Sequence, residues 1–351
     1  LGEEEHVALF TMHHIISDGW SVGVFVKELA AEYEAFVTGQ PSPLPELEIQ
    51  YADFAHWQRT QLQGDALNAQ LAYWKQQLAG APAVLKLPVD RMRGGEKVTA
   101  SSKQPLALTP ELSESLKTLS RQTGSTVFMT LLGAFQILLR HHSGTDDILV
   151  GTDVANRNRV EVENLIGFFI NQLVLRTDLS GNPSFAELLE RVRETTFGAY
   201  AHQDTPFDRL VEALKVERSL EYSPLFQVKF VYQNAPMPPL ELADLKVEVL
   251  GIESGTTKVD LQLTLWEEKD GLKGWLEYNA HLFEATTIAR LNSQFVMLLN
   301  AILAQPQLQL SDLEQVLKDA DRQFESIASR EIKESRSQKF KTIRRKAIGI
   351  N

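Results

Sequence analysis

The chain has 351 residues, a formal charge of -11 at neutral pH and no cysteine. The missing thiols exclude disulfide bridges, thiolate metal sites and a thiol nucleophile. The acidic charge argues against nucleic acid as a partner. Apolar runs are short and interrupted, so we expect no membrane span, no signal peptide and a cytoplasmic location.

The first part of the chain is predicted to hold one strand and three helices. The apolar run at 6–12 is rich in bulky and β-branched side chains, which predicts a buried strand. Apolar residues at helical spacing predict helices over 20–36, 51–63 and 68–78. Turn-forming and charged residues at 85–103 predict a crossing between two lobes.

The remainder alternates helices with strands, which predicts an α/β sandwich. We expect helices over 109–125, 127–141, 183–200, 207–214 and 284–303. We expect strands over 147–155, 168–177 and 225–232, and two or three more within 247–278.

The C-terminal end differs in charge from the rest of the chain. From 330 to 346 there are eight Lys or Arg against two Glu, a net charge of 8 - 2 = +6. Few large apolar residues accompany these charges. We therefore expect 316–351 to be a flexible, largely basic tail that serves as a linker or docks an acidic partner.

The most informative segment is MHHIISDGWS, residues 12–21. Two adjacent histidines close the predicted strand, and Asp18 and Gly19 open a turn. Because successive side chains of a strand point to opposite faces, one histidine is expected to face the packing and the other an opening. Opposed histidines leave only two ligands, so we expect no metal site here.

Five motifs in order resemble those of the condensation domains of nonribosomal peptide synthetases. They are HHIISDG, YADFAHW at 51–57, GTDVANRNR followed by IGFFIN at 151–171, HQDTPFD at 202–208 and RSLEYSPLFQ at 218–227. The resemblance runs to about residue 315. It implies an α/β, two-lobed, chloramphenicol acetyltransferase-like sandwich. The family carries a long segment before its HHxxxDG motif, so 1–95 would be a partial N-terminal lobe and 96–315 the C-terminal lobe.

The resemblance also implies the reaction. Such a domain joins a donor acyl or peptidyl thioester to an acceptor aminoacyl thioester through an amide bond, here of the type with L-configured donor and acceptor. Both substrates ride on the phosphopantetheine of upstream and downstream carrier domains, and the domain binds no cofactor of its own. Other synthetase modules are the further partners. With part of one wall absent, we expect the isolated 351 residues to be inactive.

The resemblance assigns the catalytic role to His14, whose imidazole can accept a proton, position the amine or stabilise charge. His13 is then the packed histidine. Asp18 is expected to pair with Arg157, with Arg159 as the alternative, because a buried carboxylate must be paired.

The remaining candidate residues lie in or near the same motifs. Gly19 is expected at a sharp turn, with its amide toward the reaction channel. Asn171, Gln172 and Asn234 are candidate channel residues, whereas Phe168 and Phe169 are expected in the core.

Two other functions remain open from the sequence. A coenzyme A-dependent acyltransferase of the same superfamily would use the same histidine on a free small molecule. A non-catalytic or decayed interaction module would keep the fold alone. The chain contains no GxSxG, GxxxxGK[ST] or GxGxxG motif, so hydrolase and nucleotide-binding functions lack their chemistry.

Overall fold

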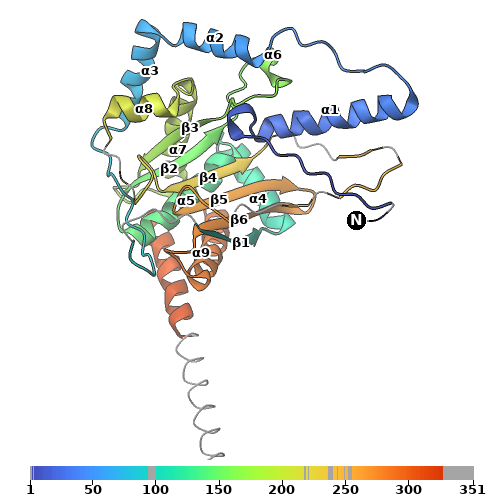
Figure 1. Ribbon diagram of the computed structural model, residues 1–351. Helices are drawn as coiled ribbons and strands as arrows, with labels where there is room; N and C mark the ends of the chain where they lie inside the picture. Colours follow the sequence, from blue (N-terminus) through green and yellow to red (C-terminus); the bar gives the residue numbers. More distant parts are fainter. Residues whose placement is uncertain are drawn as a thin grey trace, which may run out of the picture.

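The computed structural model describes residues 2, 4–93, 100–216, 219, 221–235, 240–242, 244–248, 250–251 and 255–326 (Figure 1). The strands are β1 (Ser101–Ala107), β2 (Asp147–Val154), β3 (Asn171–Asp178), β4 (Val228–Gln233), β5 (Leu261–Glu268) and β6 (Gly271–Asn279). The helices are η1 (His14–Ile16), α1 (Gly19–Thr38), α2 (Tyr51–Gln61), α3 (Gly64–Gln77), α4 (Pro110–Gln122), α5 (Val127–Ser143), α6 (Val160–Glu163), α7 (Phe185–Ala201), α8 (Phe207–Leu214) and α9 (Ala285–Ala304).

The six strands form one mixed sheet in the order β1-β6-β5-β4-β2-β3. The central strand β4 pairs in parallel with β2 and β5, and the other pairs are antiparallel. Alternate residues of β6 are buried on one face, while Lys273, Trp275 and Glu277 lie half-buried on the other. This period of two is what a sheet with one packed face requires.

The main core lies on the packed face of the sheet. Helix α5 contacts α4, α7, α9 and β2, and every residue from Met129 to Leu139 is buried. A helix that is apolar on all sides is stable only when other elements surround it. Its sequence therefore explains its central position.

Helices α1 and α2 lie apart from this core. Figure 1 shows α1 extending to one side of the sheet, and its buried residues are few: Ser21, Gly23, Val24 and Ala35. Helix α3 anchors the group to the rest, because Trp74 is 1% exposed and donates from its indole nitrogen to the carbonyl oxygen of His202 at 3.0 Å.

The expected crossing between lobes is fastened to the C-terminal half. Asp90 accepts hydrogen bonds from the Glu284 amide and the Thr287 hydroxyl at the start of α9, at 2.8 and 2.9 Å. Arg93 forms a bidentate ion pair with Asp260, which precedes β5. These contacts fix the path of the chain as it reaches β1.

The structure corrects the N-terminal strand. Residues 6–12 have no regular secondary structure, and Val7, Leu9 and Phe10 are 57 to 70% exposed. A strand requires backbone hydrogen bonds to a neighbour, and within the described ranges none of the six sheet strands pairs with this segment. The prediction of a buried strand was wrong because it rested on apolar composition alone.

Three elements escaped the sequence analysis. Strand β1 begins in the last residues of the predicted crossing and runs beyond it, and α6 is only one turn long. Residues 310–326 form a further helix, in which Leu313 and Leu317 are fully buried. This helix runs through the expected boundary at 315, and the part of the predicted basic tail from 327 onward lies outside the described residues.

Helix α9 is long and apolar enough to cross a membrane by length and composition. Eight of its residues are buried in the fold, among them Leu298, Leu299 and Ile302. It packs against α5 and β1. It is thus a core helix of the sandwich.

Candidate active site

The two histidines lie in a short turn that precedes α1. His14 begins η1, and its Nδ1 lies 2.6 Å from the carbonyl oxygen of Ser17. Since a carbonyl oxygen only accepts hydrogen bonds, Nδ1 must carry the proton. In the neutral imidazole Nε2 then keeps a free lone pair, on a side chain that is exposed. The turn presents His14 as a proton acceptor.

His13 caps the same turn. Its Nδ1 accepts a hydrogen bond from the Ile15 amide at 3.1 Å, and the residue is exposed. The prediction that His13 is the packed histidine is wrong. That prediction assumed the two faces of a strand, and the chain here is a turn without a packed face.

The carboxylate of Asp18 is buried and accepts five hydrogen bonds. Its Oδ1 accepts from the amide and the hydroxyl of Ser21, both at 2.8 Å, and from Nη2 of Arg157 at 3.3 Å. Its Oδ2 accepts from the amides of Phe169 and Ile170, at 2.9 and 3.3 Å. A carboxylate has about four lone-pair sites, so Asp18 is saturated.

Asp18 remains ionised in this setting. Burial by itself raises the pKa of its carboxyl group, but the hydrogen bonds from Ser21 and Phe169 and the charge of Arg157 outweigh burial and lower the pKa below its ordinary value. For Arg157, burial dominates and lowers the pKa, against the opposing charge of Asp18. Arginine nevertheless stays protonated at neutral pH. The result is a buried ion pair.

Arg157 also binds the segment that follows it. Its guanidinium donates to the carbonyl oxygens of Val162 and Leu165 and lies 4.0 Å from the centre of the Phe169 ring. Arg159, the alternative partner for Asp18, instead lies over the indole of Trp57, 4.4 Å from the ring centre. The structure thus brings Asp18 together with Arg157.

Ser21 is a central residue of this network that the sequence analysis missed. Its hydroxyl accepts from Arg157 at 2.8 Å and from the Gly167 amide at 3.1 Å, and lies 2.8 Å from both Asp18 Oδ1 and the Gly167 carbonyl oxygen. Asp18 is the N-cap of α1, and an aspartate that accepts from the amide three residues later is a common capping pattern. The long-range contacts of Ser21 left no signal in the sequence.

Tyr51 of α2 binds the 166–170 segment. The Tyr51 hydroxyl donates to the carbonyl oxygen of Phe168 at 2.8 Å. A Cβ atom at Gly167 would lie 2.3 Å from the Tyr51 ring, so only glycine fits. Burial, and to a lesser extent the charge of Asp18, raise the pKa of Tyr51. The tyrosine therefore stays protonated and can donate.

Phe168 is not in the core, contrary to expectation. It is 38% exposed, and its ring meets the imidazole of His14 edge to face, with the centroids 5.0 Å apart. The next residue, Phe169, is 2% exposed and packs against Phe54. Consecutive side chains point in opposite directions along an extended chain, so only one of the two reaches the interior.

Gly19 differs from its expected role. It is the first residue of α1 and does not have a positive φ, so the turn does not need glycine for its backbone. A Cβ atom here would lie at an ordinary contact distance, 3.8 Å, from Nε2 of Gln233 at the end of β4. Gln233 is a neighbour of the turn that the sequence did not reveal.

The three candidate channel residues have different surroundings. Asn171 is buried, and its amide group binds the backbone of Gln203, Thr205 and Phe207, so this side chain is structural. Gln172 borders an open cavity of about 400 Å³. Asn234 is exposed.

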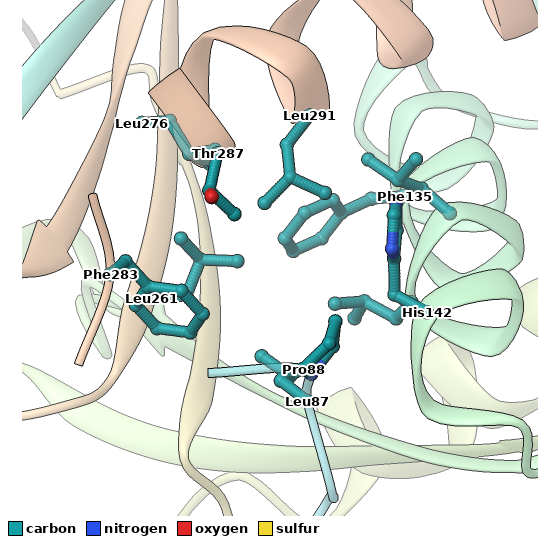
Figure 2. A pocket seen from close by; sticks show the side chains of 11 residues that line it. Leu87, Pro88, Phe135, His142, Leu261, Leu276, Phe283, Thr287 and Leu291 are labelled. Atoms are coloured by element: carbon teal, nitrogen blue, oxygen red, sulfur yellow. The ribbon is translucent and has the colours of Figure 1, made fainter. Parts of the chain in front are cut away.

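A second cavity lies within the main core (Figure 2). Its volume is about 10 Å³, close to the minimum for one water molecule, and its lining is apolar apart from His142 and Thr287. It has no room for a substrate. Among the residues that the structure describes, no three His, Asp or Glu side chains are grouped to hold a metal ion.

Comparison with known proteins identifies the family. The sequence model of the condensation domain matches residues 1–324. This chain belongs to the condensation domain family. The domain is 53% identical over 308 residues to one of the proteins that make up the linear gramicidin synthase of Brevibacillus parabrevis, and the match covers 87% of this chain and 6% of that protein. It is 48% identical to malpinin synthetase of Mortierella alpina, covering 82% of this chain and 4% of that protein.

Solved structures support the fold of this condensation domain. The X-domain from teicoplanin biosynthesis superposes with a TM-score of 0.78 at 30% identity, covering 86% of this chain and 70% of that one. That X-domain is also known in complex with OxyB. A four-domain nonribosomal peptide synthetase matches with a TM-score of 0.77 at 22% identity, over 86% of this chain and 24% of that one. The α/β, chloramphenicol acetyltransferase-like fold is therefore confirmed.

The family sets the broad function. Condensation domains of nonribosomal peptide synthetases form peptide bonds between amino acids carried on phosphopantetheine arms, and the relatives of this domain belong to such synthetases. This chain spans only 4 to 6% of the length of those two relatives.

Proposed function

We propose that this domain joins a donor thioester to the α-amine of an acceptor aminoacyl thioester, both on carrier domains, with His14 at the reaction centre. The amine nitrogen attacks the donor carbonyl carbon, the C–N bond forms, and the C–S bond breaks. The amine proton passes to Nε2 of His14 and then to the departing thiolate. Atoms and charge balance without a further reactant.

The observation that carries the proposal is the tautomer of His14. Because Nδ1 donates to the Ser17 carbonyl oxygen at 2.6 Å, the exposed Nε2 is the nitrogen that can accept a proton. An α-amine titrates near pH 8, so a fraction is neutral and nucleophilic at cellular pH. The imidazole then needs only to relieve the amine of its proton as the bond forms.

Asp18 does not act as a second base in this proposal. Its five hydrogen bonds and its lowered pKa leave it a poor proton acceptor. Its role is to fasten the His14 turn to the 167–170 segment through Ser21, Arg157 and two backbone amides. It supports the site without contacting the substrates.

The finer parts of the proposal follow from the sequence analysis. We assign L-configured donor and acceptor substrates, partners that are the neighbouring carrier domains and synthetase modules, and a cytoplasmic location. The phosphopantetheine belongs to the carriers. Gln172 and Asn234 remain proposed channel residues.

The test uses the synthetase module that carries this domain. Two carrier domains are loaded with defined aminoacyl groups, and the dipeptidyl thioester is measured by mass spectrometry after rapid mixing. Product on the acceptor carrier supports the proposal. Transfer from acyl coenzyme A to a free amine, with none between carriers, would instead identify the related acyltransferase.

A second candidate is a non-catalytic interaction module, and one observation favours it. The X-domain that superposes on this chain forms a complex with OxyB. If this domain serves only as such a platform, the loaded module forms no dipeptidyl product. The His14→Ala variant then behaves like the wild type in every assay.

A further inference from the structure

Phe168 is an aromatic side chain that is held outside the core. The structure leaves 38% of it exposed, although its neighbour Phe169 is buried among Tyr51, Phe54 and Arg157. A single exposed apolar side chain is ordinary at a protein surface, so the surroundings of Phe168 are what distinguish it. The backbone around Phe168 is held in place by hydrogen bonds.

The backbone on both sides of Phe168 is bound to buried groups. Its own carbonyl oxygen accepts from Tyr51, and the next two amides donate to Oδ2 of Asp18. The amide of the preceding residue, Gly167, donates to the Ser21 hydroxyl, which lies 2.8 Å from the Gly167 carbonyl oxygen. The buried network that anchors the His14 turn therefore also sets the position of the Phe168 ring.

The ring is placed against the imidazole of His14. The centroids are 5.0 Å apart and the planes meet at 88°, a favourable edge-to-face geometry. His14 is thus restrained twice, by its hydrogen bond to the Ser17 carbonyl oxygen and by the phenyl ring. A group that approaches the imidazole to hydrogen-bond distance brings its substituents within reach of the exposed part of Phe168.

We infer that Phe168 is a positioning and specificity-determining residue, whose ring holds His14 and limits the size of the acceptor side chain. The inference rests on the proposed function. Because the reacting amine is one bond from the acceptor α-carbon, the substituent on that carbon lies beside the imidazole and its aromatic neighbour. Loss of the ring frees His14 to rotate and opens space for a bulkier, β-branched acceptor.

The test compares Phe168→Ala with two other variants in the loaded module. Phe168→Tyr keeps the ring. Phe197→Ala removes a phenylalanine that is 55% exposed on α7 and has no contact with His14 or its anchor among the described residues. Each variant is assayed with an alanyl and a valyl acceptor on the same carrier, and kcat and KM are obtained for both.

We expect Phe168→Ala to lower kcat for the alanyl acceptor by roughly 2- to 10-fold, the size of one aromatic pair contact. The ratio of valyl to alanyl kcat/KM should rise by a similar factor. Phe168→Tyr and Phe197→Ala should keep the wild-type ratio. A ratio unchanged in Phe168→Ala overturns the specificity role, and an unchanged kcat overturns the positioning role.

A second measurement does not depend on activity. In the wild type, the carbon-bound protons of the His14 ring lie in the ring current of Phe168, so their NMR shifts should move in Phe168→Ala but not in Phe197→Ala. Shifts that do not move contradict the contact itself. If the wild-type module forms no amide while these shifts do move, the proposed function fails and the positioning contact stands. If Phe168→Ala does not fold, Phe168→Leu replaces it in both measurements.

Discussion

The main core and the region around His14 are stabilised in different ways. The main core is one continuous cluster of buried apolar side chains from α3, α4, α5, α7, α8, α9 and the sheet. Within the part of the chain that the structure describes, the other region has a separate apolar cluster of four buried residues, Phe54, Val162, Leu165 and Phe169. Next to these four lies the buried network of Asp18, Ser21 and Arg157.

The difference teaches where each region is vulnerable. In a large apolar core, removal of one side chain leaves many others in place, and the cost depends on the cavity. In a small cluster next to an ion pair, removal of one charge leaves the other buried without compensation. The site region should therefore open locally while the sheet stays folded.

The largest effect is expected for Asp18→Ala. The substitution leaves Arg157 and the amides of Phe169 and Ile170 buried without their partner. It should lower the free energy of unfolding of this region by about 3 to 5 kcal/mol. Hydrogen exchange should show lost protection at those amides with β2 and β5 still protected. The exposed Asp208 offers a control, because Asp208→Ala should leave every rate near wild type. Equal loss across the sheet would show that the two regions unfold as one.

The main core should respond to acid through His142. Burial, only partly offset by the hydrogen bond to Gln294, lowers the pKa of this imidazole from 6.5 to about 4. The unfolded chain thus binds its proton first as the pH falls below 6.5. Protonation of His142 in the unfolded chain should therefore lower the free energy of unfolding by about 2 kcal/mol between pH 7 and pH 5.

The measurement for His142 is urea unfolding at the two pH values, followed on the sheet. In His142→Gln the loss of stability between pH 7 and pH 5 should shrink by that amount. A pH dependence that the substitution leaves unchanged would mean that His142 already titrates normally in the fold.

The smallest effect is expected for Tyr51→Phe, which removes only the hydroxyl that binds the Phe168 carbonyl oxygen. One such hydrogen bond is worth about 1 kcal/mol. Faster exchange confined to the Phe169 and Ile170 amides is the expected signature. If those amides exchange as in the wild type, Tyr51 does not support the segment.

Much of the fold could be predicted from local patterns. Helix α5 follows from its largely apolar sequence and β6 from its alternation of buried and half-buried residues. Both patterns arise from burial against other parts of the same chain. The prediction of a strand at 6–12 was wrong. An apolar run indicates that burial is favourable, but it does not indicate which other segment would cover it. Strand β1 was not predicted because its sequence is largely polar and it forms by pairing with β6, which is distant in the chain.

The site was predictable to the extent that its residues lie in motifs. The motif resemblance suggested both Asp18 and Arg157, which are 139 positions apart and meet in the structure. Ser21, Tyr51 and the outward ring of Phe168 could not be predicted, because their roles depend on how the 166–170 segment lies against α1 and α2. Two consecutive phenylalanines carry no sign of which one is buried.

The central claim is that the anchored turn presents His14, and not His13, to the reacting amine. The direct measurement is single-turnover dipeptidyl thioester formation by the loaded module with His14→Ala and with His13→Ala. Loss of the proton acceptor should slow His14→Ala by roughly 10²- to 10⁴-fold, with carrier loading and melting temperature unchanged. The exposed His13 should be replaceable with a rate near wild type. A His14→Ala variant that forms the amide at the wild-type rate would contradict the account.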